Sequence, residues 1–101
     1  MDEQRLKMDS TVRQNDRTAA RRVGQKTLVV VIDTNHLHKL NDTGGRVWDL
    51  CDGRTVGEVA ECVAAEYALS SVEAERDVRA FVHALHAAGA VTVEERAVVD
   101  G

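Results

Sequence analysis

Aromatic side chains are scarce in this 101-residue chain, which has one Trp, one Tyr, one Phe and no proline. Three rings do not provide a stacking platform for single-stranded nucleic acid, which needs exposed aromatics beside basic residues. No apolar run approaches the roughly 18 to 20 residues of a membrane-spanning helix, and the N-terminus is too charged for a secretory signal peptide. We therefore expect a cytoplasmic protein with no membrane partner.

Cysteines and catalytic motifs are also few. Cys51 and Cys62 are 11 residues apart, which matches no zinc-ligand spacing, and both fall at apolar positions of helical patterns. We expect them to be buried, reduced thiols. No HExxH, phosphate-binding loop, GxGxxG or nucleophile elbow is present, and a chain of this length has one core without a deep cleft. The prediction is a protein that is not an enzyme and has no cofactor.

Charge is divided unevenly along the chain. Residues 1–40 have eight Lys and Arg against five Asp and Glu, whereas residues 41–101 have five against twelve, a net charge of −7. A DNA-binding domain collects positive charge on its recognition element, because phosphate neutralisation supplies most of its non-specific affinity. The acidic second half therefore argues against a nucleic-acid partner.

Strand patterns occupy the first half. Residues 1–17 are polar with no sustained apolar period, which predicts a mobile N-terminal arm. Residues 18–22 are a candidate short strand, and the five aliphatic residues 28–32 fit a central strand covered on both sides. Turn residues at 33–35 then predict a hairpin into a third strand at 36–40.

Three helical patterns follow, each with apolar residues at three- and four-residue steps. The second and third open with a hydroxyl residue three positions before a glutamate, the spacing of a capping box. The expected starts are Asn41 or Thr43, Thr55 and Ser70, and Gly53 and Gly89 end the first and third. We expect an α+β fold, like a winged helix-turn-helix, with a three-stranded antiparallel sheet followed by three helices packed on one face.

The four histidines form two close pairs, His36 with His38 and His83 with His86. Each pair can place two imidazoles on one face, so a small metal-dependent enzyme is one alternative. No cysteine or carboxylate lies at a recognised ligand spacing beside them, and the two pairs would have to converge across the domain. We therefore expect no metal site.

Residues 40–56 carry a family signature, Leu-Asn-Asp-Thr-Gly-Gly-Arg-Val-Trp-Asp-Leu-Cys-Asp-Gly-Arg-Thr-Val. The stretch resembles the PqqD family of small peptide-binding proteins, in which Leu-Asn precedes Thr-Gly-x-x-(Ile/Val)-Trp-x-Leu and Asp-Gly-x-Thr-Val-x-Glu. Asp-Val-Arg-Ala-Phe-Val-His-Ala-Leu at 77–85 and Ala-Gly-Ala-Val at 88–91 are close to its later motifs. The resemblance covers about residues 18–93, with departures at Gly45, Val82 and Ala90.

The family's members are also called RiPP recognition elements, after the ribosomally made, modified peptides that they serve. The resemblance implies a peptide chaperone that binds the leader of a precursor peptide by strand addition and presents it to a modifying enzyme, such as a radical SAM protein. An edge strand has unpaired backbone groups that suit this role. The leader would lie between the third strand and the third helix, which gives these peptide-binding residues: His36, Leu37, His38, Lys39, Leu40, Arg76, Val78, Arg79, Val82, His83, Leu85 and His86.

The expected organisation is a peptide-binding domain over residues 18–93, preceded by the arm at 1–17 and followed by a polar tail at 94–101. Three helices beside a hairpin also describe a winged-helix DNA-binding regulator, which is the main alternative because a fold alone does not name a partner. The exposed strand edge also leaves a homodimer or a hairpin swap open.

Overall fold

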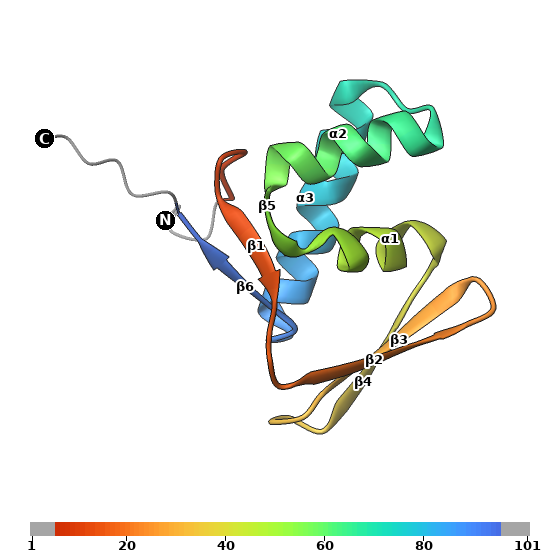
Figure 1. Cartoon of the computed structure of the whole chain (residues 1–101), viewed down its shortest axis with the longest axis vertical. Coiled ribbons are helices and arrows are strands. Elements are labelled where there is room, and N and C mark those ends of the chain that lie inside the picture. The colour runs from red at the N-terminus through yellow and green to blue at the C-terminus, as the bar shows by residue number, and fades with distance from the viewer. Residues whose placement is uncertain (1–5, 96–101) are drawn as a thin grey trace, which may run out of the picture.

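Two three-stranded antiparallel sheets and three helices make up the fold (Figure 1), and the computed structural model describes residues 6–95. The hairpin sheet has the order β2 (Thr18–Val23), β3 (Lys26–Val31), β4 (His36–Leu40). The terminal sheet has the order β5 (Asp52–Thr55), β1 (Thr11–Gln14), β6 (Val91–Glu94). The helices are α1 (Asp42–Leu50), α2 (Val56–Tyr67) and α3 (Ser71–Ala87). Within residues 6–95, no helix has the length and apolar character needed to cross a membrane.

The predicted α+β fold, with three antiparallel strands before three helices, is confirmed by the hairpin sheet and α1 to α3. In its central strand β3, Val29 pairs with Ala20 of β2 and with His38 of β4. The β3 side chains alternate, so that Thr27, Val29 and Val31 are buried while the residues between them are partly exposed. The hairpin sheet therefore has one inner face against the helices.

The expectation that the central strand is covered on both sides is wrong. The outer face of the hairpin sheet carries Val30 between Ala19 of β2 and Leu37 of β4, and Leu37 is 58% exposed. Ile32, the last residue of the predicted strand, lies in the turn and is 48% exposed. A run of aliphatic residues is compatible with either arrangement, because a strand with one wet face can still be rich in β-branched residues.

The N-terminal segment is the main departure from the sequence prediction. Strand β1 pairs with β6 from Thr11 opposite Glu94 to Gln14 opposite Val91, and its other edge pairs with β5. The side chains of Leu6, Ser10 and Val12 are buried. The prediction of a mobile arm is therefore wrong for residues 6–17. These residues are held by pairing with strands some 40 to 80 residues away, which no local sequence pattern reveals.

The rest of the predicted arm, residues 1–5, lies outside the described residues, as do residues 96–101 of the predicted C-terminal tail. Glu94, the first residue of that tail, is the last residue of β6. Residues Val91–Glu94 thus form one edge of the terminal sheet. Residues 52–55, read from the sequence only as a helix end and a helix start, form the opposite edge of the same sheet.

The helix starts agree with the sequence prediction. Asn41, not Thr43, caps α1, and its side-chain Oδ1 accepts a hydrogen bond of 2.7 Å from the backbone NH of Gly44. Both predicted capping boxes are complete, with hydroxyl and carboxylate each accepting from the other residue's backbone NH. These boxes are Thr55 with Glu58 at 3.1 and 2.9 Å, and Ser70 with Glu73 at 3.1 and 3.2 Å.

Helix α1 lies very close to both its neighbours because its first turn contains two glycines, Gly44 and Gly45. A Cβ added at Gly44 would lie 2.7 Å from Cε1 of Phe81 on α3. A Cβ added at Gly45 would lie 3.1 Å from Cβ of Thr27 on β3, and closer still to its hydroxyl. The Thr27 hydroxyl is buried and has no hydrogen-bond partner among residues 6–95. The start of α1 is thus wedged between α3 and the hairpin sheet.

We expect Gly45→Ala to destabilise the fold, since the clash with a central-strand side chain costs about 1–3 kcal/mol against a helix-propensity gain of about 1 kcal/mol. Thr27→Ala removes the hydroxyl, the nearest opposing atom, and leaves Cβ, so Gly45→Ala should cost less stability in the Thr27→Ala background than in the parent. Urea unfolding of the four proteins measures this coupling. A Gly45→Ala protein as stable as the parent would contradict the close packing described above.

Candidate functional site

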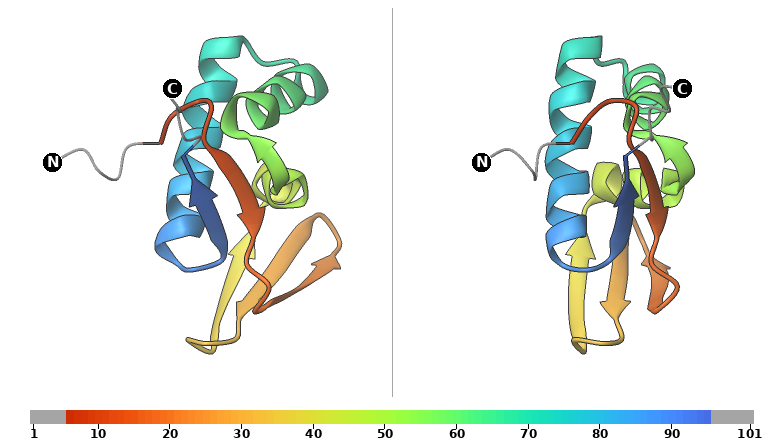
Figure 2. Two further views of the ribbon diagram at one scale, coloured as in Figure 1. Left: turned by 60° about the vertical axis from the view of Figure 1, so that its left-hand side comes forward. Right: turned by 90° about the vertical axis from the view of Figure 1, so that its left-hand side faces the viewer.

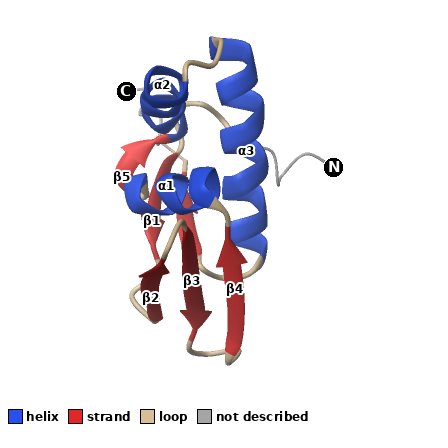
Figure 3. Cartoon of the chain, turned by 90° about the vertical axis from the view of Figure 1, so that its right-hand side faces the viewer, coloured by secondary structure: helices blue, strands red, loops and turns tan. Residues whose placement is uncertain are grey.

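Strand β4 is an edge of the hairpin sheet, paired with β3 on one side and with no other described strand. In an antiparallel pair, alternate residues direct both backbone groups away from the partner. Roughly two or three of the five β4 residues therefore present a free NH and CO at this edge. Of the three strands, β4 also lies nearest to α3 (Figures 2 and 3). A second extended chain can add to the sheet here.

A groove of about 510 Å³ lies beside α3 where β4 runs into α1. We call it the α3 groove, and its lining residues are Asn41, Thr43, Asp77, Ala80, Phe81 and Ala84. Three of the four α3 positions carry apolar side chains, and Phe81 packs against the backbone of Gly44. Asp77 and Thr43 supply a carboxylate and a hydroxyl. The site thus combines an unpaired strand edge with a mostly apolar wall.

The five β4 residues predicted to bind peptide lie along the strand edge, and none of them lines the α3 groove. His36, His38 and Leu40 stand opposite buried residues of β3 and therefore lie on the inner face, toward the helices. Leu37 and Lys39 lie on the outer face and are exposed. Only the three inner side chains share the α3 side of the sheet, whereas the backbone of all five residues lies along the edge.

His38 has an unusual environment for an imidazole. Its Nε2 atom is buried and has no hydrogen-bond partner among residues 6–95. The ring stands edge-on to that of His36, with 6.3 Å between the ring centroids. A buried, unpaired polar atom costs about 1–3 kcal/mol. A bound chain that supplied a partner at this position would relieve that cost.

The α3 residues predicted to bind peptide lie outside the α3 groove. Val78 and Val82 are fully buried and Leu85 is 3% exposed, so these three pack in the core. Arg79 approaches Sδ of Met8 at 3.9 Å, and Arg76 lies 3.8 Å from the Asp77 carboxylate. His83 and His86 are exposed. None of these seven residues lines the α3 groove.

The groove residues of α3 are a neighbouring stripe that the sequence reasoning missed. Asp77, Phe81 and Ala84 follow at steps of four and three, the spacing of residues on one helix face. A one-residue offset turns a helix by about 100°, which places Val78, Val82 and Leu85 toward the core. The 4–3 spacing was a usable signal, but an alanine and an aspartate do not stand out as a binding surface.

The strongly perturbed ionisable groups stabilise structure. Arg46 of α1 donates two hydrogen bonds of 2.7 and 2.8 Å to Glu66 of α2, and this pairing lowers the pKa of Glu66 and raises that of Arg46. Burial, then the Asp42 carboxylate 3.4 Å away, raises the pKa of the Tyr67 hydroxyl. Burial, with help from two nearby aspartates, raises the pKa of Cys51 to about 12. A thiol in that state is not a nucleophile at neutral pH.

The two histidine pairs are separate features, one on β4 and one on α3. Within the described part of the chain, no three His, Cys, Asp or Glu side chains gather in a way that would hold a metal ion. The unpaired edge of β4 is suited to binding an extended chain.

The sequence matches the family described as coenzyme PQQ synthesis protein D (PqqD) over residues 26–91, which is 66 of the 101 residues. This range contains the hairpin strands β3 and β4, all three helices and the α3 groove. No curated protein sequence matches the chain.

Three solved structures have a similar fold. The NMR structure of the PqqD truncation of Methylobacterium extorquens PqqCD, described as a stand-alone RiPP recognition element, has a TM-score of 0.74 and 19% identity, covering 91% of this chain and 99% of that one. TbiB1 in complex with the TbiA(beta) leader peptide has a TM-score of 0.72 and 22% identity, and the match covers 87% of this chain and 99% of that one. Lasso peptide synthetase B1 complexed with the leader peptide has a TM-score of 0.69 and 24% identity, and the match covers 80% of this chain and 96% of that one.

The two thiols should differ in reactivity. Because its raised pKa leaves Cys51 protonated and its side chain is only 1% exposed, it should not react with a disulfide reagent at pH 8, whereas the half-buried Cys62 should. We expect the reagent to modify one thiol per chain in the native protein and two per chain in urea. The variant Cys62→Ser should react only when unfolded. Fast native modification of that variant would contradict the burial of Cys51.

Proposed function

This chain belongs to the PqqD family, as its sequence motifs predicted, and from that premise we propose that it binds the leader of a ribosomally made precursor peptide. The observation that carries the proposal is the unpaired edge of β4 beside the α3 groove. An extended leader would add to the hairpin sheet as a fourth strand. Two proteins of similar fold, TbiB1 and lasso peptide synthetase B1, have been solved with leader peptides, which supports this role.

The energetics require both parts of the site. Roughly four to six backbone hydrogen bonds at about 0.5–1.5 kcal/mol each supply about 2–9 kcal/mol, and association costs about 4–15 kcal/mol in lost freedom. Backbone pairing alone therefore does not give a micromolar complex, which needs about −8 kcal/mol. The remainder has to come from side chains of the leader that bury apolar surface in the α3 groove.

The groove chemistry indicates what the leader should contain. Ala80, Phe81 and Ala84 form an apolar wall, and the small side chains of the two alanines leave room for a larger apolar residue of the peptide. Asp77 lies on the same stripe, one turn before Phe81, and its carboxylate favours a Lys or Arg nearby. Because alternate side chains of a strand point to the same face, the leader residues that select for this protein should be two positions apart.

This proposal changes the residues assigned to the site. We retain the β4 backbone from His36 to Leu40 and the inner side chains of that strand. On α3 the contacts are now assigned to Asp77, Ala80, Phe81 and Ala84, in place of the predicted residues. Leader binding itself requires no cofactor and no catalytic group, so the protein would act as a peptide chaperone.

The benefit of such a chaperone is effective concentration. A leader held at β4 keeps the attached core peptide near a modifying enzyme, such as a radical SAM protein, if that enzyme also binds this chain. Gains of 10²–10⁴-fold in apparent affinity are typical for such linked binding. The duplex-DNA alternative has no support of this kind, because the helices carry the acidic half of the chain.

Ala84→Arg should weaken leader binding at least tenfold, since it places a long charged side chain in the apolar wall. The matched control is Ala19→Arg on β2, the opposite edge of the same sheet, which should change the affinity less than twofold. Fluorescence anisotropy with the leader of a precursor encoded beside this gene measures both. Equal affinities for the two variants would exclude the α3 groove as the leader site.

Strand addition also predicts a period of two along the leader. A single backbone N-methyl group should weaken binding when that NH faces β4 and have little effect at the positions between, because strand NH groups alternate in direction. A series of leader peptides, each methylated at one successive residue, tests this by the same anisotropy assay. A loss at every position, or at none, would be incompatible with an added strand.

A further inference from the structure

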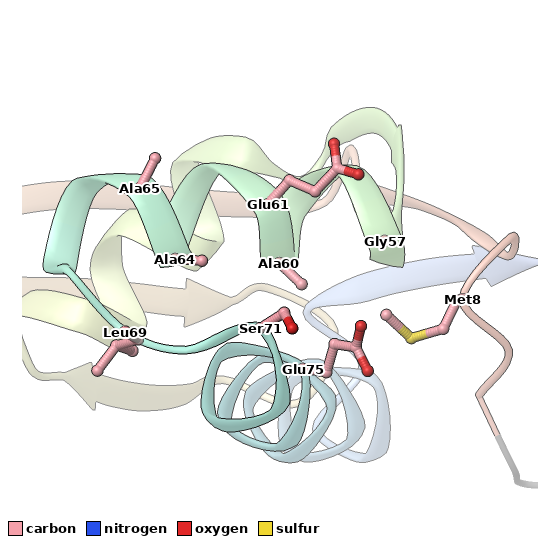
Figure 4. Close-up of a pocket in the computed structure, with 9 residues that line it drawn as sticks. All are labelled: Met8, Gly57, Ala60, Glu61, Ala64, Ala65, Leu69, Ser71 and Glu75. Carbon is pink, nitrogen blue, oxygen red and sulfur yellow. The ribbon is translucent and has the colours of Figure 1, made fainter.

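A second groove, of about 580 Å³, lies between α2 and the N-terminal end of α3, and we call it the acidic groove. Figure 4 shows Met8 and Glu75 side by side at one end of it and Leu69 at the other. Its surface is mostly apolar, from Ala60, Ala64, Leu69 and Met8. Glu61 and Glu75 also line it, and in Figure 4 the Glu75 side chain lies beside Met8 while that of Glu61 points away from Ser71. Small side chains on α2 keep the groove open.

The groove lies in the most acidic stretch of the chain. Residues 56–75 contain five glutamates and no Lys, Arg or His. Three of the five have local roles, since Glu58 and Glu73 close capping boxes and Glu66 pairs with Arg46. The other two, Glu61 and Glu75, line the groove. Arg79 approaches Sδ of Met8, which lines the groove, at 3.9 Å.

The acidic groove and the α3 groove are on opposite sides of α3. Glu75 lines one and Asp77 lines the other, and two residues along a helix amount to a turn of about 200°. None of their lining residues is shared. A chain bound at β4 therefore leaves the acidic groove open, so the two sites can be occupied together.

The groove's walls indicate the form of its occupant. No residue of a described strand lines it, so an occupant finds no row of backbone groups to pair with. A segment whose backbone hydrogen bonds are internal, as they are in a helix, suits such a groove. The α2 lining residues run from Gly57 to Ala65, which spans about 12 Å at 1.5 Å per residue. That length matches about two turns of an added helix.

We propose that the acidic groove docks a basic amphipathic helix of a second protein, with apolar side chains against Ala60, Ala64 and Leu69 and Lys or Arg against Glu61 and Glu75. The second protein would be the enzyme that acts on the bound peptide, and this identification rests on the proposed function. The preference of the groove for a basic helix does not depend on the proposed function. Complementary charge along the groove would speed association and select the partner.

The probe is a labelled 14-residue peptide with Leu on one helical face and Lys on the other. Its control has the same Leu positions and Glu in place of Lys. The Lys peptide should bind with an affinity that falls as salt rises, and the Glu peptide at least tenfold more weakly. In NMR spectra of the unchanged protein, amides of residues 57–75 should shift on titration while those of β4 stay in place.

The double variant Glu61→Lys, Glu75→Lys should lose at least tenfold in affinity for the Lys peptide. Both side chains are exposed, so the fold should be retained, and circular dichroism checks this. The charge control is Asp16→Lys, which replaces an exposed carboxylate in the β1–β2 connection. Its affinity for the Lys peptide should fall less than twofold. Adding saturating leader peptide should leave the affinity unchanged.

Three results would overturn the proposal. The first is equal affinity of the double variant and the Asp16→Lys control. The second is a set of shifts confined to β4 and the α3 groove, which would place the probe in the leader site. The third is a dimer in sedimentation equilibrium that the double variant abolishes, which would assign the groove to a second copy. A leader peptide that fails to bind at β4, with the probe still bound at residues 57–75, would refute only the proposed function.

Discussion

The close approach of α1 to both of its neighbours is the contact on which the candidate peptide site depends. Gly44 packs against Phe81 of α3 and Gly45 packs against Thr27 of β3, with no room for a Cβ at either position. The same turn of α1 is where β4 ends, since Asn41 both leaves the strand and caps the helix. Two missing methyl groups thus set how far α3 lies from the strand edge, and therefore the width of the α3 groove.

Much of this arrangement was predictable because it is encoded locally. Capping boxes, a hairpin turn and apolar steps of three and four act over a few residues, so α2, α3 and the strand at 36–40 were found close to their observed bounds. The signature around Trp48 gave the family for the same reason, since it encodes the strand end and two helix starts in one stretch.

The terminal sheet was not predictable from local patterns. Val12 looked isolated in a polar segment, yet it is fully buried because β5 and β6 come together on either side of β1. Three of the predicted α3 contacts are ruled out for a different reason. Val78, Val82 and Leu85 are buried in the core, and the face of a helix that packs in the core cannot also contact a peptide. The inner side chains of β4 lie on the helix side of the sheet, and their contact with a peptide stays a prediction.

A peptide-binding edge has to meet two opposing requirements, since a strand that is open to a leader is also open to a second copy of the same chain. Strand β4 is only five residues long and has the sequence His-Leu-His-Lys-Leu. A symmetric antiparallel pair of two such strands would set His38 against His38 and Lys39 against Leu37. Neither is among the aromatic, β-branched or opposite-charge pairs that stabilise neighbouring strands. A leader is free of that symmetry and can place its own apolar residues toward the α3 groove, so the composition of β4 favours the peptide over self-association.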